Sequence, residues 1–176
     1  PVGMRAGLVD GALLMMEMPD DIVRSISMNV PCVSIVHRFP NLAIDSIDCD
    51  PGLATHELVH RFVAAGHRRI GFLAWGAGTS WEVYGFRGFR EALFAHGIEH
   101  DPTFVPGVER PLPDRAAFAD AVLELLDGGV TAMVCTADEI AADVRAVLAA
   151  RSGSLARQPV LGAYGGGPVG RACPGL

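Results

Sequence analysis

The chain alternates between short runs of continuous apolar residues and longer stretches in which apolar residues recur every three or four positions. Continuous runs are typical of strands buried on both faces, and the wider spacing is typical of helices with one buried face. The predicted strands are residues 12–16, 32–37, 46–49, 70–75, 104–105, 131–136 and 159–164. The predicted helices are residues 22–28, 51–65, 81–96, 114–128 and 139–150. This alternation predicts an α/β fold of parallel sheets flanked by helices.

The helix at 51–65 has clear boundary signals. Asp50 can cap it, Pro51 occupies the first turn, where a missing N–H costs nothing, and Gly66 suits its end. Helical periodicity predicts a buried face formed by Ala54, Leu58, Phe62 and Ala65.

The same helix contains the H-E-x-x-H pattern, from His56 to His60. On a helix this pattern can place two imidazoles on one zinc ion beside a glutamate that acts as general base. The predicted buried face, however, turns both histidines toward solvent. The longer zinc-binding form of the motif would need its glycine and third histidine at Val63 and Gly66, which do not match. A zinc peptidase is therefore a distant alternative, and we expect no metal site, no cofactor and no enzymatic activity.

Composition narrows the function classes. The chain has 176 residues, half of them hydrophobic, and a net charge of −6. Its scattered basic residues do not form the stripe that neutralises phosphates, so it is a poor nucleic-acid binder by itself. Its apolar runs are far shorter than the ~20 residues that cross a bilayer, so we expect no membrane contact and a cytoplasmic location.

The four cysteines show no C-x-x-C spacing. We expect them to be small buried hydrophobic residues, without disulfides or cysteine-based zinc sites.

A glycine-rich stretch at 76–80 predicts a boundary between two subdomains. The expected division is 1–75 for a partial N-terminal α/β subdomain, 76–162 for a C-terminal one, and 163–176 for an irregular tail. Since the chain starts at Pro1 and strand material follows closely, we expect it to be a piece of a longer protein.

Several single residues near predicted strand ends are ambiguous. Asp138 is first of all a helix cap, although caps at the carboxyl ends of parallel strands also line ligand crevices. Trp75 is either packing or a stacking wall for a ligand. Gly76-x-Gly78 lacks the third glycine of a dinucleotide loop, and Ser80 lacks the G-x-S-x-G setting of a hydrolase nucleophile.

Several segments, in the same order along the chain, together resemble the effector-binding domain of LacI/GalR transcriptional regulators. The strongest are G-H-R-R-I at 66–70, R-G-F-R-E-A-L at 87–93 and A-M-V-C-T-A-D-E-I-A at 132–141; residues 9–14, 31–38 and 160–162 add to them. The resemblance implies a periplasmic-binding-protein-like fold, with two parallel-sheet α/β subdomains around a hinged cleft. It also implies that the chain is truncated at both ends and lacks the family's helix-turn-helix headpiece.

Carried over by position, the resemblance places ligand contacts at His37, Gly85, Ala137, Asp138 and Tyr164. Only Asp138 matches the family's usual residue; the other four replace aspartate, arginine, asparagine and aspartate respectively. These departures remove groups that grip sugar hydroxyls and suggest a more aromatic cleft. The expected effector-binding residues are His37, Trp75, Ser80, Trp81, Asp138 and Tyr164.

The leading hypothesis is therefore the ligand-sensing and dimerisation domain of a LacI/GalR-like regulator. It would bind a sugar or related small molecule in the cleft between the subdomains, and operator DNA only through a headpiece outside this chain. The alternative is a solute-binding protein of an uptake system, which would require a signal peptide.

Overall fold

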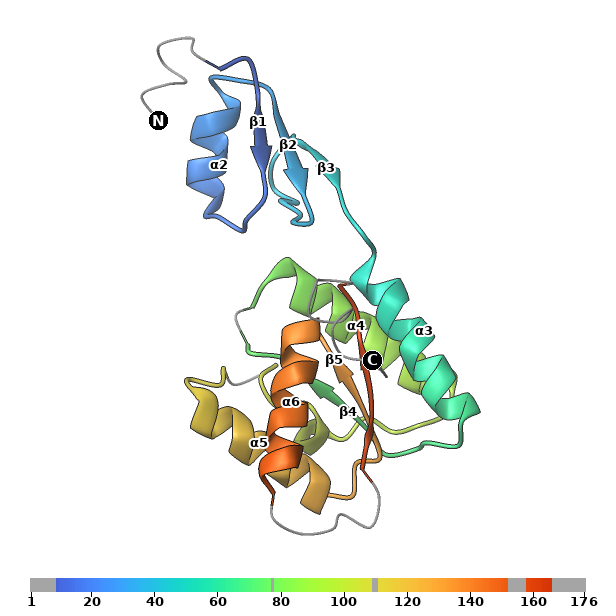
Figure 1. Cartoon of the computed structure of the whole chain (residues 1–176). Coiled ribbons are helices and arrows are strands. Elements are labelled where there is room, and N and C mark those ends of the chain that lie inside the picture. The colour runs from blue at the N-terminus through green and yellow to red at the C-terminus, as the bar shows by residue number, and fades with distance from the viewer. Residues whose placement is uncertain (1–8, 77, 109–110, 152–157, 166–176) are drawn as a thin grey trace. The chain divides into compact units, whose positions relative to one another are not determined.

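The computed structural model describes residues 9–76, 78–108, 111–151 and 158–165. The chain divides into two compact units, Pro1–Cys49 and Asp50–Leu176. Each is a three-stranded parallel sheet with helices packed on it, so the predicted fold class is confirmed (Figure 1). No helix in the described part of the chain is both long enough and apolar enough to cross a bilayer.

Within residues 9–49, the described part of the first unit, the chain forms one helix and one sheet. Its elements are β1 (Ala12–Leu14), α2 (Asp20–Ser27), β2 (Cys32–Ile35) and β3 (Asp45–Ile47), with the strands in the order β1-β2-β3. Its small core consists of Leu14, Val23, Ile26, Val30 and Phe39. Since side chains alternate along a strand, Leu13 points away from this core, and it is 66% exposed.

The second unit has three layers. Its elements are α3 (Pro51–Ala64), β4 (Ile70–Leu73), α4 (Ser80–Ala95), the 3-10 turn η1 (Pro102–Phe104), α5 (Arg115–Asp127), β5 (Ala132–Cys135), α6 (Asp138–Ala150) and β6 (Val160–Ala163). The sheet order is β4-β5-β6, and all pairs are parallel.

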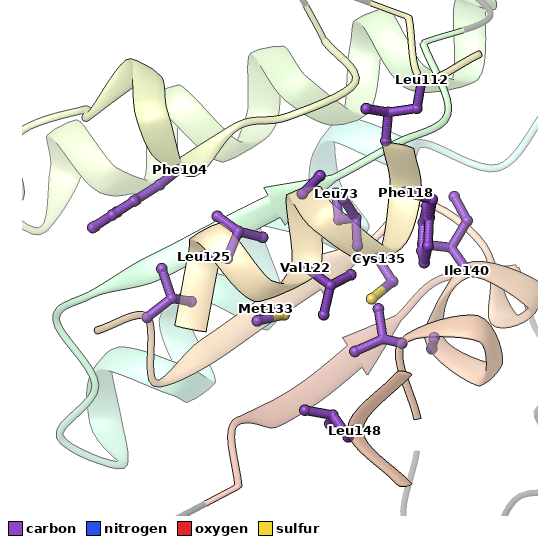
Figure 2. Packing of buried hydrophobic residues seen from close by; sticks show 14 residues of the cluster. Leu73, Phe104, Leu112, Phe118, Val122, Leu125, Met133, Cys135, Ile140 and Leu148 are labelled. Atoms are coloured by element: carbon purple, nitrogen blue, oxygen red, sulfur yellow. The ribbon is translucent and has the colours of Figure 1, made fainter. Parts of the chain in front are cut away.

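Alternate residues of β4 and β5 face the two helical layers. Leu73, Met133 and Cys135 pack with α5 and α6, as Figure 2 shows. Phe72 and Val134 pack on the other face with α3 and α4. Both strands are buried along their full length, as the continuous apolar runs predicted.

The division between units differs from the one expected near Gly76: the structure places it between Cys49 and Asp50. Strand β4 belongs to the second unit because Ile70–Leu73 pairs with Ala132–Cys135. The glycine-rich stretch is therefore the connection from β4 to α4 within one unit. Residues 166–176 of the expected tail lie outside the described residues.

Two other expectations are corrected. Residues 104–105 do not form a strand, because Phe104 N–H bonds to Asp101 within the turn η1 instead of to β4. In α3 the buried residues are Pro51, Thr55, Val59 and Phe62, whereas Ala65, just after the helix, is exposed. The buried face is rotated from the predicted one because α3 packs on α4 as well as on the sheet.

The cysteines are only partly as expected. Cys135 is buried, but Cys49, which follows β3, is exposed, and Cys173 lies outside the described residues.

Candidate functional site

The carboxyl ends of β4 and β5 form a topological switch point in the second unit. The chain leaves β4 toward α4 on one face of the sheet, and it leaves β5 toward α6 on the opposite face. Where neighbouring parallel strands continue to opposite faces, the two connections separate and leave a crevice that commonly binds ligands. The candidate site is this end of the sheet.

Trp81, in the first turn of α4, crosses from the β4 side to the β5 side. Its indole Nε1–H donates to the carbonyl oxygen of Thr136 at 2.8 Å, and Thr136 N–H donates to the Leu73 carbonyl at 3.2 Å. Trp81 is half-buried and packs beside the core of the α3–α4 face. These bonds fix an aromatic surface at the switch point.

The loop before α4 is held by a capping arrangement. The Thr79 hydroxyl accepts from Glu82 N–H at 3.2 Å, and the Glu82 carboxylate accepts from the N–H groups of Gly76 and Gly78 at 3.2 and 2.9 Å. This is a variant of the Thr-x-x-Glu capping box, in which the glutamate satisfies loop amides. Gly76 has φ 81°, and a Cβ there would lie 2.6 Å from the Pro111 Cα, so this loop position requires glycine.

Tyr164 follows β6 and lies beside Trp81, with ring centroids 5.2 Å apart. It is 7% exposed. A Cβ built on Gly85 would lie 2.9 Å from Tyr164 Cζ and nearer still to its hydroxyl oxygen. The phenol therefore occupies the space that a side chain at position 85 would need.

Burial raises the pKa of Tyr164, and the nearby Thr55 hydroxyl opposes part of this shift. Both hydroxyls are buried, and neither makes a hydrogen bond of ordinary geometry within the described residues. Tyr164 is thus a neutral phenol at the meeting point of β6, α3 and α4.

Asp138 is buried, at 5% exposure, and is the first residue of α6. The predicted capping role is wrong, because Ala137 holds the cap position. Asp138 instead places its carboxyl in the first helical turn, where the helix dipole favours negative charge.

The other predicted site residues are Trp75, Ser80 and His37. Trp75 stacks on Phe118 at 4.7 Å and packs into the α5–α6 layer, on the opposite face of the sheet from Tyr164. Ser80 is the first residue of α4. His37 belongs to the first unit, where its Nδ1 lies 3.5 Å from the Glu17 carboxylate.

The histidines of the H-E-x-x-H pattern do not converge on a metal-binding group. His60 is exposed, and its Nδ1 lies 3.3 Å from Nε2 of His96. Glu57 forms a hydrogen-bonded ion pair with Arg61 at 2.8 Å, which lowers the pKa of its carboxyl. Within the described residues, no three or more His, Cys, Asp or Glu side chains are grouped so that they could hold a metal ion.

Comparison with known proteins decides the family. Residues 59–154, more than half of the chain, match the family described as periplasmic binding protein-like domain. The chain belongs to this family. The match lies within the second unit and includes Trp81, Gly85 and Asp138.

One curated relative is a transcriptional regulator. The chain is 34% identical over 98 residues to the HTH-type transcriptional regulator CelR of Thermobifida fusca, a match that covers 50% of this chain and 29% of that protein. The chain thus spans under a third of this curated relative.

Solved structures agree on the fold. The CelR–cellobiose complex has a TM-score of 0.75 at 27% identity and covers 95% of this chain and 52% of that one. CcpA of Lactococcus lactis has a TM-score of 0.82 at 19% identity and covers 99% and 65%. A LacI-family regulatory protein from Chloroflexus aggregans has a TM-score of 0.78 at 22% identity and covers 99% and 64%. The predicted resemblance to effector-binding domains of LacI-family regulators is confirmed.

Proposed function

We propose that this chain is the effector-sensing domain of a LacI-family-like transcriptional regulator and that its effector is a sugar. The observation that carries the proposal is the Trp81–Tyr164 pair at the switch point of a domain in this family. In such a regulator the domain itself catalyses no reaction. Effector binding shifts a conformational equilibrium and so changes the affinity of an attached headpiece for its operator.

The site chemistry suits a sugar. The half-buried Trp81 offers an apolar aromatic ring on which a pyranose can stack, and carboxylates such as that of Asp138 accept hydrogen bonds from hydroxyl groups. We assign Trp81, Asp138 and Tyr164 to the part of the site that the second unit provides. His37, Trp75 and Ser80 remain predicted contacts.

Cellobiose is the first effector to test, because the CelR structure that resembles this chain is a complex with that sugar. We would titrate cellobiose into the full-length protein and follow tryptophan fluorescence and binding heat. Saturable binding that is lost in Trp81→Ala but kept in Phe94→Ala would support the proposal. Phe94 is a matched control because it lies on the same helix and is 87% exposed. Equal binding by Trp81→Ala and the unsubstituted protein would contradict it.

The regulatory part of the proposal concerns the whole protein, which we propose to be a cytoplasmic homodimer that reaches operator DNA through a separate headpiece. A mobility-shift assay of the full-length protein with DNA upstream of its own gene tests this. We expect binding whose strength changes when the effector is added. A full-length protein that carries a signal peptide and binds no DNA would instead favour a solute-binding protein of an uptake system.

A further inference from the structure

We propose that His60 and His96 together bind a zinc ion where α3 meets the end of α4. His60 Nδ1 lies 3.3 Å from His96 Nε2. This is not the site that the H-E-x-x-H pattern suggests, because it joins one histidine of that pattern to a residue 36 positions further along the chain. The inference goes beyond the proposed function and does not depend on it.

The distance between the two nitrogens fits one zinc ion. Zinc binds imidazole nitrogen at about 2.0–2.1 Å and prefers a tetrahedral arrangement of ligands. Two ligands of such a tetrahedron lie about 3.3–3.4 Å apart. The observed 3.3 Å matches this separation and is longer than the ~2.9–3.0 Å of a typical N–H···O hydrogen bond. A zinc ion can therefore contact both nitrogens without moving α3 away from α4.

The backbone holds the two histidines opposite each other. A Cβ on Gly88 would lie 2.6 Å from Cα of Gly52, so α3 and α4 are in close contact at these glycines. His60 follows Gly52 by eight residues and His96 follows Gly88 by eight, which is about two helical turns along the same contact. The His96 N–H also donates to the Ala92 carbonyl at 3.1 Å, which fixes the end of α4. The pair is thus positioned before any ion arrives.

The two imidazoles have the lone pairs that zinc needs. A neutral imidazole carries one N–H and one lone pair, so without metal the pair forms a single hydrogen bond. With zinc bound, His60 would keep its proton on Nε2 and His96 on Nδ1, and the two facing nitrogens would be the ligands. His60 is exposed and His96 is half-buried, so water can complete the coordination of the ion.

The charged groups nearby limit the affinity. The pKa of the Glu57 carboxyl is lowered chiefly by Arg61 and to a smaller extent by His60, so this carboxylate lies near the pair. Arg68 opposes a cation, since its Nη1 donates to the His96 carbonyl oxygen at 3.4 Å. With two protein ligands and this mixed charge, zinc should bind more weakly than at closed sites with four protein ligands.

Calorimetric titration of the full-length protein with zinc chloride tests the site. His60→Ala and His96→Ala should each weaken zinc binding at least about tenfold, because loss of even an outer hydrogen-bond partner of a metal site costs about 10–100-fold. His56→Ala is the matched control, since it removes the other histidine of the H-E-x-x-H pattern from the same helix. This variant should keep the zinc affinity of the unsubstituted protein. Magnesium chloride should give no heat from this site, because magnesium prefers oxygen ligands.

Urea unfolding followed by tryptophan fluorescence gives an independent readout. Zinc that binds the folded arrangement stabilises it, so zinc should raise the urea midpoint of the unsubstituted protein. The same rise should occur in His56→Ala and be absent in His96→Ala. Neither His60 nor His96 is a core residue, so their substitution by alanine should leave the fold intact.

Two results would overturn the inference. Equal zinc affinity in the unsubstituted protein and in His96→Ala would show that the pair forms a hydrogen bond only. Equal loss of zinc binding in His56→Ala and His60→Ala would assign the ion to the H-E-x-x-H pattern instead. Neither result bears on the sensing of an effector by Trp81 and Tyr164.

Discussion

Gly88→Ala tests how closely α3 and α4 are packed. A Cβ on Gly88 would lie 2.6 Å from Cα of Gly52 and 2.7 Å from its carbonyl carbon. These neighbours are backbone atoms of another helix, so they cannot rotate away as a flexible side chain would. The two helices would have to separate along a contact that also buries Val59, Phe89 and Leu93.

Gly88→Ala should destabilise the protein, whereas glycine-to-alanine substitution in a helix ordinarily stabilises it. Replacing glycine by alanine inside a helix normally stabilises a protein by about 1 kcal/mol. Overpacking a close contact costs about 1–3 kcal/mol, and we take the upper part of this range because backbone is involved. The net prediction is a loss of roughly 1–2 kcal/mol in the free energy of unfolding.

Urea unfolding followed by tryptophan fluorescence measures this change in the second unit alone. Trp75 and Trp81 are the only tryptophans in the chain, and both belong to that unit. A lower urea midpoint at unchanged slope is the expected result. An increase in stability of about 1 kcal/mol, as for an unhindered helical site, would show that the helices are not in close contact at Gly88.

Three more predictions follow from the same unit. Phe89→Ala should lower the free energy of unfolding by about 3–5 kcal/mol, because Phe89 is only 1% exposed. Phe94→Ala on the same helix should change it by no more than about 0.5 kcal/mol, because Phe94 is 87% exposed. Similar urea midpoints for the two variants would contradict the placement of Phe89 in the core. Glu82→Ala should lower the free energy of unfolding by about 1–3 kcal/mol and speed proteolysis at the loop before α4, because two loop amides lose their hydrogen-bond acceptor. An unchanged cleavage rate would contradict the role of Glu82 in holding this loop. Burial raises the pKa of the Cys135 thiol to about 12, so the unfolded chain releases this proton first as pH rises above ~8.5. The free energy of unfolding should therefore fall by up to about 1.4 kcal/mol per pH unit at alkaline pH. In denaturation series from pH 8 to 10, the stability of the Cys135→Ala variant should fall less steeply than that of the unsubstituted protein. Parallel curves for the two proteins would refute the raised pKa of the Cys135 thiol.

Sequence patterns predicted the elements well where burial is complete. The run at 70–75 and that at 131–136 became β4 and β5 because both faces of these strands are covered, which leaves no polar positions to blur the pattern. The unit boundary was harder, because a glycine-rich loop looks the same within a domain as between domains. Only the pairing of β4 with β5 shows that this glycine-rich loop lies within the second unit.

The candidate site was predictable only in part. The Thr79-x-x-Glu82 spacing is a readable capping signal that the sequence analysis missed. Helical periodicity predicted the buried face of α3 only approximately, because the sequence of one helix does not show that a second helix packs beside it. Positional resemblance pointed to both Gly85 and Tyr164. It could not show that they touch, because residues far apart in sequence meet only through tertiary packing.

The segment after η1 has a consequence for the solubility of the protein. The turn η1 and this segment lie close to β4, the first strand in the sheet order, without pairing with it: a Cβ on Gly71 would lie 3.4 Å from the Phe104 carbonyl oxygen, and one on Gly107 would lie 2.7 Å from the Ala74 carbonyl carbon. An open strand edge is a template for pairing with another chain, and a covering segment blocks this. A bulky residue in place of Gly107 would displace this covering segment. We therefore expect its first effect to be self-association of the protein rather than loss of the fold.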